Sequence, residues 1–595
     1  MKKFAPALLL ALFVFAAYVP ALRNGFVWDD TALVLRDPLI RSWRLIPEGF
    51  QHFLFTDATA SDFYRPIQRL TYTIEYGAFA VRPWAYHLTS IVCHLGAALA
   101  LLLLAGELLR AFGVEQGTRR IVAWVATLAW AVHPVHNASV DYIAGRADPL
   151  AAIFGFLGFY FAVRGEREGN RWRWLGLATG FFLLSALSKE MGLIFLLLWL
   201  GVVVLRKNWK GLLRWSVVVA VVATVYLSLR MPAEHVAAPT IHAPAPLLVR
   251  PIIAARAFAE YAELMVAPIN LHMDRDVETR PNGFNQESAT NTAWRELETL
   301  LGIALIAAAL WWIVRLRRRE PAAFALIMLA VVAYVPVSGA LLLNATIAEH
   351  WLYLPTAFLF LGAALATVPL FRRPAAAKFL IALVSLWIGG LGVRTFIRAF
   401  DWKDQRTFFE RTIAAGGDSA RMLINLAGVE MNEGDLSSSK KHLLEALAKD
   451  PDQPLALLNL AAVAIKGEDY KGAHECLDRA EKMPLVEAQS YELRAVLENK
   501  ELGKTNLLRM RLASRTGPPN WQIEKRYIKV LDESGANAAA IAELQSVLQR
   551  EWYRAESWQL LSALLAKSGH RAEASAALER AEAYDVHLSL RPKPL

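Results

Sequence analysis

Cysteine is almost absent from this sequence. Only Cys93 and Cys476 occur among its 595 residues, the first in an apolar run and the second in the polar last third of the chain. Two cysteines so far apart provide neither a disulfide framework nor a zinc site. The sequence therefore excludes a small domain held together by disulfides or by a structural metal, and it leaves the redox compartment open.

Acidic residues are outnumbered by basic residues, 54 against 64, which gives a formal net charge of +10. Such an excess can indicate nucleic-acid binding. Most of it falls here in short connections between apolar runs, where basic residues set the orientation of membrane helices. We therefore expect no nucleic-acid partner and expect membrane lipids instead.

Long apolar stretches dominate the first two thirds of the chain, and 55% of all residues are hydrophobic. A helix that crosses a bilayer needs roughly 20 mostly apolar residues. About eleven stretches meet or approach that length: 4–22, 84–110, 120–134, 148–164, 172–188, 190–206, 213–230, 297–314, 321–343, 350–371 and 376–398. They predict an all-α, polytopic bundle over residues 1–400. The segment 248–268 contains four charged residues and is interpreted as an interfacial or re-entrant helix.

The first 22 residues allow two interpretations. Lys2 and Lys3 precede an apolar stretch that ends in small residues, Ala17 to Ala21, as in a secretory signal. We favour an uncleaved first span, because cleavage would leave the following loop without an anchor.

The distribution of basic residues predicts the orientation of the bundle. With eleven spans, every basic cluster lies on the cytoplasmic side, as the positive-inside rule requires. These clusters are Lys2-Lys3, Arg119-Arg120, Arg164 to Arg173, Arg206 to Lys210, Arg315 to Arg319 and Arg372-Arg373. The N-terminus is then cytoplasmic and the C-terminus is outside, which is the periplasm for a protein of the bacterial inner membrane. Two large loops, 23–83 and 231–296, lie on the external side.

Residues 401–595 have a different pattern, with short amphipathic segments and a period of 34 residues. Leu426-Ala427 recurs as Leu460-Ala461, and Ala446 recurs as Ala480. This resembles the tetratricopeptide repeat (TPR), in which small residues allow paired helices to touch. Units near 420, 454 and 555 are clear, whereas the two within 488–553 are degenerate. We expect a C-terminal TPR α-solenoid in the periplasm.

Two adjacent carboxylates, Asp29 and Asp30, follow the first span closely. Neighbouring side chains point in different directions, so one can face a substrate while the other braces the loop. A carboxylate at a dry membrane boundary can have a raised pKa and act as a general base. The alternative is a solvated acidic turn that caps the following helix.

Several basic and polar residues fall on the same external side. Arg65 can hold a phosphate with paired hydrogen bonds or anchor a lipid headgroup. His133-Pro134-Val135-His136 opens a turn that runs to Gly145-Arg146-Ala147-Asp148. Its proline prevents the helical histidine spacing of zinc enzymes, and His136 can equally be structural. Arg146 needs a partner because it lies between two spans.

Two further external turns carry charge. In Ser188-Lys189-Glu190, the last two residues either pair with each other, or Lys189 faces an anion while Glu190 orients it. Glu349-His350 begins a turn that continues through aromatic residues suited to the membrane interface, Trp351 and Tyr353.

In this order, the motifs resemble the transmembrane-and-TPR O-mannosyltransferase family of the GT-C glycosyltransferase superfamily. His133-Pro134-Val135-His136 through Gly145-Arg146-Ala147-Asp148 resembles the HP-x-H…GRAD block of that family. The segment from Asn24 to Asp30 is similar to the acidic motif of its first luminal loop. Tyr64-Arg65-Pro66, Ser188 to Glu190, Pro268 to Asp274 and Glu349 to Pro355 match further blocks.

The resemblance implies an inverting transfer of a sugar from a polyprenyl-phosphate donor to a hydroxyl group, Ser or Thr of a periplasmic protein that binds the repeats. The catalytic acid of the family corresponds to Asp29-Asp30, and we favour Asp30 slightly. Binding of the donor phosphate is assigned to Arg65, Arg146, Lys189, His136 and His350. Positioning of the substrate is assigned to His133, Asp148, Glu190 and Glu349. The superfamily includes metal-dependent and metal-independent enzymes, so a divalent cation stays open and no residue is assigned as a metal ligand.

Two other interpretations fit the same features. One is a non-enzymatic TPR membrane scaffold or a transporter of lipid-linked sugar, which would need a polar path through the spans. The other keeps the donor chemistry and has a glycan or a lipid as the acceptor.

Overall fold

The computed structural model describes residues 5–56, 62–168, 171–233, 247, 249–275, 277, 286–340, 346–372, 374–483 and 486–590. Within these ranges the chain is helical and has no β-strand, only one isolated bridge between Arg275 and Ile347. The predicted all-α class is confirmed. Much of the second external loop, 231–296, lies outside the described residues.

Helices coincide with each of the eleven predicted spans. They are α1 (Ala5–Tyr18), α4 (Pro83–Ala111), α5 (Gln116–Ala131), α7 (Ala147–Arg167), α8 (Arg171–Ser188), α9 (Ile194–Leu205), α10 (Trp209–Arg230), α12 (Gln286–Arg319), α13 (Pro321–Tyr334), α14 (Tyr353–Thr367) and α15 (Pro374–Arg398). Among the described residues, seven helical segments are long and apolar enough to cross a membrane, and α9 and α13 form part of shorter apolar segments. The chain is thus a multi-pass membrane protein, and seven of its described helical segments meet this test of length and composition.

In the bundle, small residues on one helix leave room for large aromatic rings of a neighbouring helix. Phe195 of α9 packs directly over Gly155 of α7, where a Cβ atom would collide with the ring. Trp130, Phe156 and Trp199 lie fully buried in the same apolar core. Close approach at glycine is typical of helix packing in membranes, where lipid tails are as apolar as the side chains.

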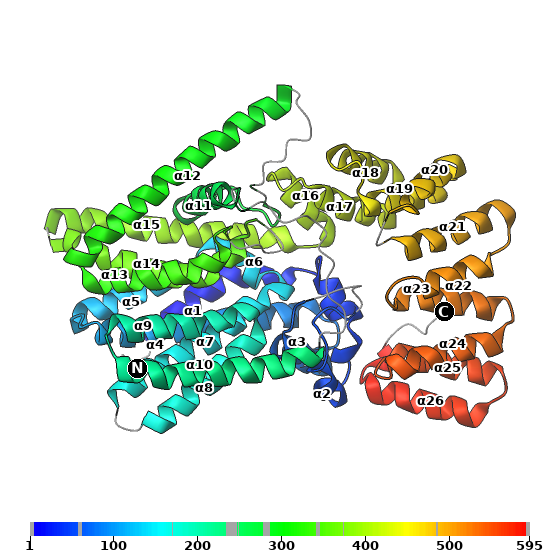
Figure 1. Ribbon diagram of the computed structural model, residues 1–595, viewed down its shortest axis with the longest axis horizontal. Helices are drawn as coiled ribbons and strands as arrows, with labels where there is room; N and C mark the ends of the chain where they lie inside the picture. The colour runs from blue at the N-terminus through cyan, green and yellow to red at the C-terminus, as the bar shows by residue number, and fades with distance from the viewer. Residues whose placement is uncertain are drawn as a thin grey trace.

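The segments outside the bundle form a cap at one of its ends. The first external loop contains α2 (Ile46–Gly49) and α3 (Pro66–Phe79), and α6 (Asn137–Val140) follows α5. The predicted interfacial segment 248–268 contains α11 (Arg250–Val266). The connections α4–α5, α9–α10 and α12–α13 lie at the left end of Figure 1, whereas α3 and the C-terminal helices lie towards the right.

The C-terminal region consists of α16 (Gln405–Ala414) and five helix pairs: α17 (Ala420–Glu433) with α18 (Leu436–Lys449), α19 (Pro454–Lys466) with α20 (Tyr470–Ala480), α21 (Glu487–Leu502) with α22 (Leu507–Arg515), α23 (Trp521–Glu533) with α24 (Asn537–Arg550), and α25 (Ala555–Lys567) with α26 (Arg571–Tyr584). The first helices of the pairs begin at residues 420, 454, 487, 521 and 555. The 34-residue period therefore continues through the region whose sequence is degenerate.

The solenoid curves so that both of its ends contact the first external loop (Figure 1). At its start, the amide of Gly25 donates to the carbonyl of Lys403 (2.8 Å), and Phe408 and Met422 pack with Val27. At its end, the hydroxyl of Tyr76 donates to the carboxylate of Asp585 (2.7 Å). The helix pairs therefore form an arch that is attached to the membrane domain at both ends.

Candidate functional site

The acidic motif of the first external loop has a strained backbone. Trp28 has φ +48°, a conformation that bulky residues rarely adopt. Its ring stacks on Tyr142, with ring centroids 6.1 Å apart and planes 21° apart. Strain of this kind persists only where surrounding contacts hold it, and it is concentrated at functional sites.

Asp30 is buried completely and joins two external segments. Its carboxylate accepts the amide hydrogens of Val27 (3.1 Å) and Ala144 (2.8 Å), and it does not cap the helix that follows. Burial raises the pKa of Asp30 to about 8, against the opposing effect of these amides. Such a pKa would suit a base, but both oxygens are occupied and no surface is exposed to a substrate. The geometry therefore does not support the slight preference for Asp30 over Asp29 as the general base.

Asp29 is only partly buried, unlike Asp30. Its amide donates to the hydroxyl of Tyr142 (3.1 Å). Burial raises the pKa of the Asp29 carboxyl, and the Tyr142 hydroxyl and the charges of Arg421 and Arg65 oppose that rise. Asp29 therefore has the partly dry, charge-balanced surroundings that a general base needs.

Five of the predicted site residues gather beside α3. Arg65 Nε pairs with Glu190 (3.0 Å), and Lys189 Nζ pairs with Asp148 (2.6 Å). The half-buried ring of His350 interacts electrostatically with Lys189, Asp148 and Arg65. Each cation is held in place by a carboxylate, and the Arg65 guanidinium has further donors at its Nη atoms for an anion.

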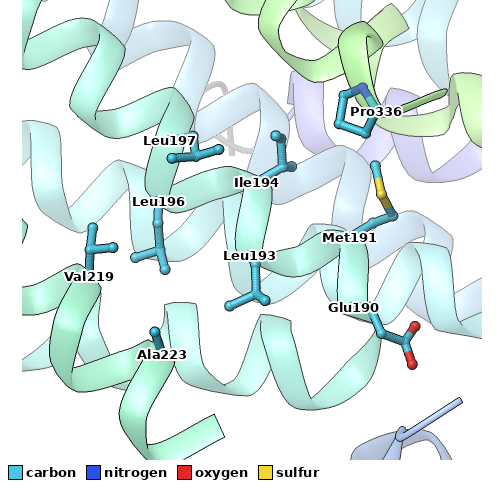
Figure 2. A pocket seen from close by; sticks show the side chains of 9 residues that line it. All are labelled: Glu190, Met191, Leu193, Ile194, Leu196, Leu197, Val219, Ala223 and Pro336. Atoms are coloured by element: carbon cyan, nitrogen blue, oxygen red, sulfur yellow. The ribbon is translucent and has the colours of Figure 1, made fainter. Parts of the chain in front are cut away.

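An apolar groove begins at this cluster. Its volume is about 330 Å³, and it lies between η7 (Glu190–Leu193) with α9 on one side and α10 on the other. Figure 2 shows Glu190 at one end of the groove and aliphatic side chains along the rest: Leu193, Ile194, Leu196, Leu197, Val219 and Ala223. The lining is thus apolar except for Glu190, which pairs with Arg65.

Arg146 is not part of the cluster. It is fully buried, where it donates to Glu75 (2.5 Å), Ser90 (3.1 Å) and the carbonyl of Tyr86 (2.5 Å). A charged partner was expected for Arg146, and the structure shows that it is Glu75 of α3. A guanidinium that is enclosed and already bonded does not fit the predicted contact with phosphate.

The side chains of the two histidines of the turn are fully buried. His136 is fully buried among the rings of Trp130 and Tyr353, and His133 accepts the amide hydrogen of Val135 (3.3 Å). His133 also contacts the carbonyl of Met265 (3.4 Å), as a structural histidine would, whereas the two buried ring nitrogens of His136 have no hydrogen-bond partner among the described residues. Across the described part of the chain, no group of three or more His, Cys, Asp or Glu side chains could hold a metal ion.

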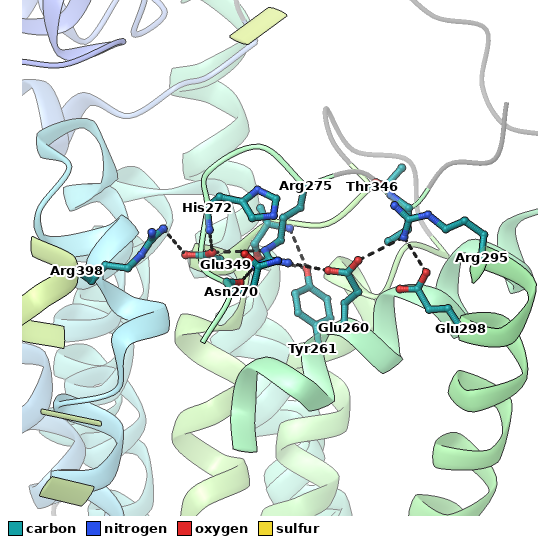
Figure 3. Close-up of polar contacts among 12 residues, drawn as sticks. Glu260, Tyr261, Asn270, His272, Arg275, Arg295, Glu298, Thr346, Glu349 and Arg398 are labelled. Carbon is teal, nitrogen blue, oxygen red and sulfur yellow. Dashed lines mark hydrogen bonds and ion pairs between the residues drawn. The ribbon is translucent and has the colours of Figure 1, made fainter. Parts of the chain in front are cut away.

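Glu349 braces the second external loop instead of facing a substrate. Its buried carboxylate accepts from the amide of His272 (2.6 Å), from Arg275 Nε (3.4 Å) and from Arg398 (3.1 Å) at the end of α15. Figure 3 shows these groups converging on Glu349, with Glu260 continuing the network through Arg275. Glu349 therefore fixes the position of residues 270–275 next to the site.

Three residues of the site could not be assigned a role from the sequence alone. Trp28 and Tyr142 lie within the recognised motifs, but their stacking depends on the tertiary fold. Arg421 comes from α17, and its guanidinium carbon lies 5.4 Å from the centroid of the Trp28 ring. A residue so distant along the chain could be placed here only by the structure.

Known proteins are similar to this chain over part of their length. Over 457 residues, or 73% of this chain, it is 25% identical to a protein O-mannosyl-transferase of Caenorhabditis elegans. It is 27% identical to TMTC3 of Homo sapiens over 30% of the chain, and 29% identical to Tmtc1 of Drosophila melanogaster over 31%. The chain is similar to protein O-mannosyl-transferases. The resemblance inferred from the motifs is confirmed.

These relatives are longer than the region they share with the chain. The match spans 61% of the worm protein, 19% of human TMTC3 and 21% of the fly protein. No protein-family model matches the chain. A solved structure, the human IFIT1 dimer with PPP-AAAA, aligns over 74% of this chain and 91% of that chain with 14% identity, but its TM-score of 0.19 supports no argument.

Replacing Glu349 by Gln tests its bracing role. The change leaves Arg275 and Arg398 buried without their carboxylate, which typically costs about 3 kcal/mol or more. We expect a clear fall in the thermal unfolding midpoint in detergent. Glu433→Gln, at an ion pair whose glutamate side chain is 45% exposed, is the matched control and should change the midpoint little. Equal midpoints for the two variants would contradict the role.

Proposed function

We propose that the protein is an inverting glycosyltransferase that moves a sugar from a polyprenyl-phosphate donor to a hydroxyl group of a protein. The observation that carries the proposal is the placement of the half-buried Asp29 near Arg65, whose ion pair marks the mouth of an apolar groove. The similarity to protein O-mannosyl-transferases supports mannose as the sugar and Ser or Thr as the acceptor.

The reaction needs a base on one side of the sugar and an anion holder on the other. Asp29 takes the proton of the acceptor hydroxyl while its oxygen attacks the anomeric carbon. The bond from that carbon to the phosphate oxygen breaks, and the lipid phosphate leaves with the electron pair. Attack opposite the leaving group inverts the configuration of the sugar.

Arg65, Lys189 and His350 form the anion holder. Glu190 holds the Arg65 guanidinium and Asp148 holds the Lys189 ammonium before the lipid-linked sugar binds. Donors positioned in advance stabilise the charge that develops on the phosphate at little reorganisation cost. Glu190 and Asp148 thus position the cations and do not need to touch the sugar.

The groove accommodates the first isoprenoid units of the donor. Its aliphatic lining lies between membrane helices, while Glu190 and Arg65 lie at its charged mouth. A polyprenyl chain in the groove would bring its phosphate to the cluster and leave the sugar pointing towards Asp29. A transporter of lipid-linked sugar would need a polar path through the spans, whereas transfer at the external face needs none.

The orientation of the site follows from the basic connections. They lie at the end of the bundle away from α3 and the helix pairs (Figure 1). Under the positive-inside rule that end is cytoplasmic, so the site and the TPR domain are on the external face. In a bacterial inner membrane this face is the periplasm, where the arch of repeats is open to acceptor proteins.

Single replacements of the acidic pair test the proposed base. Asp29→Asn removes the proton acceptor and should lower transfer from mannosyl-phosphoryl-polyprenol to a Ser/Thr peptide by about 100-fold or more. Its thermal midpoint should stay near that of the wild type. Asp30→Asn should lower the midpoint, because an amide group cannot accept both backbone hydrogen bonds. Full transfer by Asp29→Asn would exclude Asp29 as the base.

Filling the groove tests the donor class. Ala223→Trp places an indole within the lining, and we expect a higher KM for a long-chain polyprenyl donor than for a short, soluble analogue. Leu213→Trp on the same helix is the control, because Leu213 is exposed on the outside of the bundle. Equal KM values for both donors in Ala223→Trp would argue against a lipid tail in the groove.

A further inference from the structure

The first TPR helix places a cation at the acidic motif. Arg421 lies in the opening turn of α17, and its Nη2 donates to the carboxylate of Asp274 (2.6 Å). The guanidinium carbon also lies 5.4 Å from the centroid of the Trp28 ring. Contacts on both sides fix the direction of this side chain, although it is 53% exposed.

The position of α17 is fixed by packing as well as by charge. Ser419 caps the helix by accepting the amide hydrogen of Met422 (3.3 Å). Met422 and Leu426 are buried in the same cluster as Val27 and Tyr142. The helix is therefore part of the core that supports the acidic motif, and Arg421 is held there with little freedom to move.

Four ionisable groups face Asp29 from the surrounding elements. Asp30 lies beside it on the same loop, Arg65 precedes α3, Tyr142 follows α6 and Arg421 comes from α17. Two of these groups are cations, and they reach Asp29 from different parts of the fold. Cations near a carboxylate favour its ionised form, which is the form that accepts a proton.

We propose that Arg421 is a positioning residue for Asp29, so that the first TPR helix is a structural part of the active site. The catalytic consequence rests on the proposed function, whereas the electrostatic link between the two side chains does not. The repeats then do more than recruit an acceptor, because they complete the surroundings of the base.

The direction of the effect follows from the charge. Arg421 opposes the rise that burial causes in the pKa of Asp29. Its removal should raise that pKa further, so Asp29 would become protonated at a higher pH. Activity that requires the carboxylate should consequently be lost at a higher pH as the solution is acidified.

Arg421→Gln, Arg421→Lys and Arg479→Gln in the full-length protein test the proposal. A carbodiimide reacts with protonated carboxyl groups, and mass spectrometry follows its modification of Asp29 across pH without requiring activity. We expect the midpoint in Arg421→Gln to rise, because a cation that favours the ionised carboxylate is removed. Arg421→Lys should stay close to the wild type, as should Arg479→Gln, which changes an exposed arginine of α20.

The same variants are then assayed for transfer from mannosyl-phosphoryl-polyprenol. The acidic limb of the pH profile should move with the modification midpoint in Arg421→Gln. An unchanged midpoint, or an equal change in Arg421→Lys, would overturn the positioning role. A wild type that modifies normally but transfers no sugar would instead refute the proposed function and leave the electrostatic link intact.

Discussion

The bracket made by Asp30 is the interaction on which the candidate site depends. One buried carboxylate accepts amide hydrogens from Val27 and Ala144, and thereby joins the first external loop to the turn before α7. Each buried amide would cost free energy without this acceptor. Because the bracket fixes the backbone on both sides, Trp28 stacks on Tyr142 and Asp29 is left at the surface of the site.

The membrane domain and the repeats form one structure around this bracket. The solenoid is attached to the first external loop near Gly25 at one end and near Tyr76 at the other. Tyr76 belongs to α3, whose first turn follows Arg65, so the far end of the arch contacts the helix that begins directly after Arg65. Attachment at both ends limits the motion of the repeats relative to the membrane domain.

Patterns within one segment were readable from the sequence. The apolar runs predicted a helix at each of the eleven expected positions, and the 34-residue period anticipated helix starts at 420, 454 and 555. Roles that depend on distant partners were not readable. Arg146 is neutralised by Glu75, 71 positions earlier, and Arg421 reaches Trp28 from another domain. Motif order identifies the residues near a site, but burial decides which of them a substrate can touch.

A cryo-EM map of the protein with a bound polyprenyl phosphate would test the central claim most directly. The account predicts phosphate density beside Arg65 and Lys189, lipid density between α9 and α10, and Asp29 on the open side of the phosphate. Phosphate density at Arg146 or His136, or a lipid chain bound elsewhere on the bundle, would contradict it.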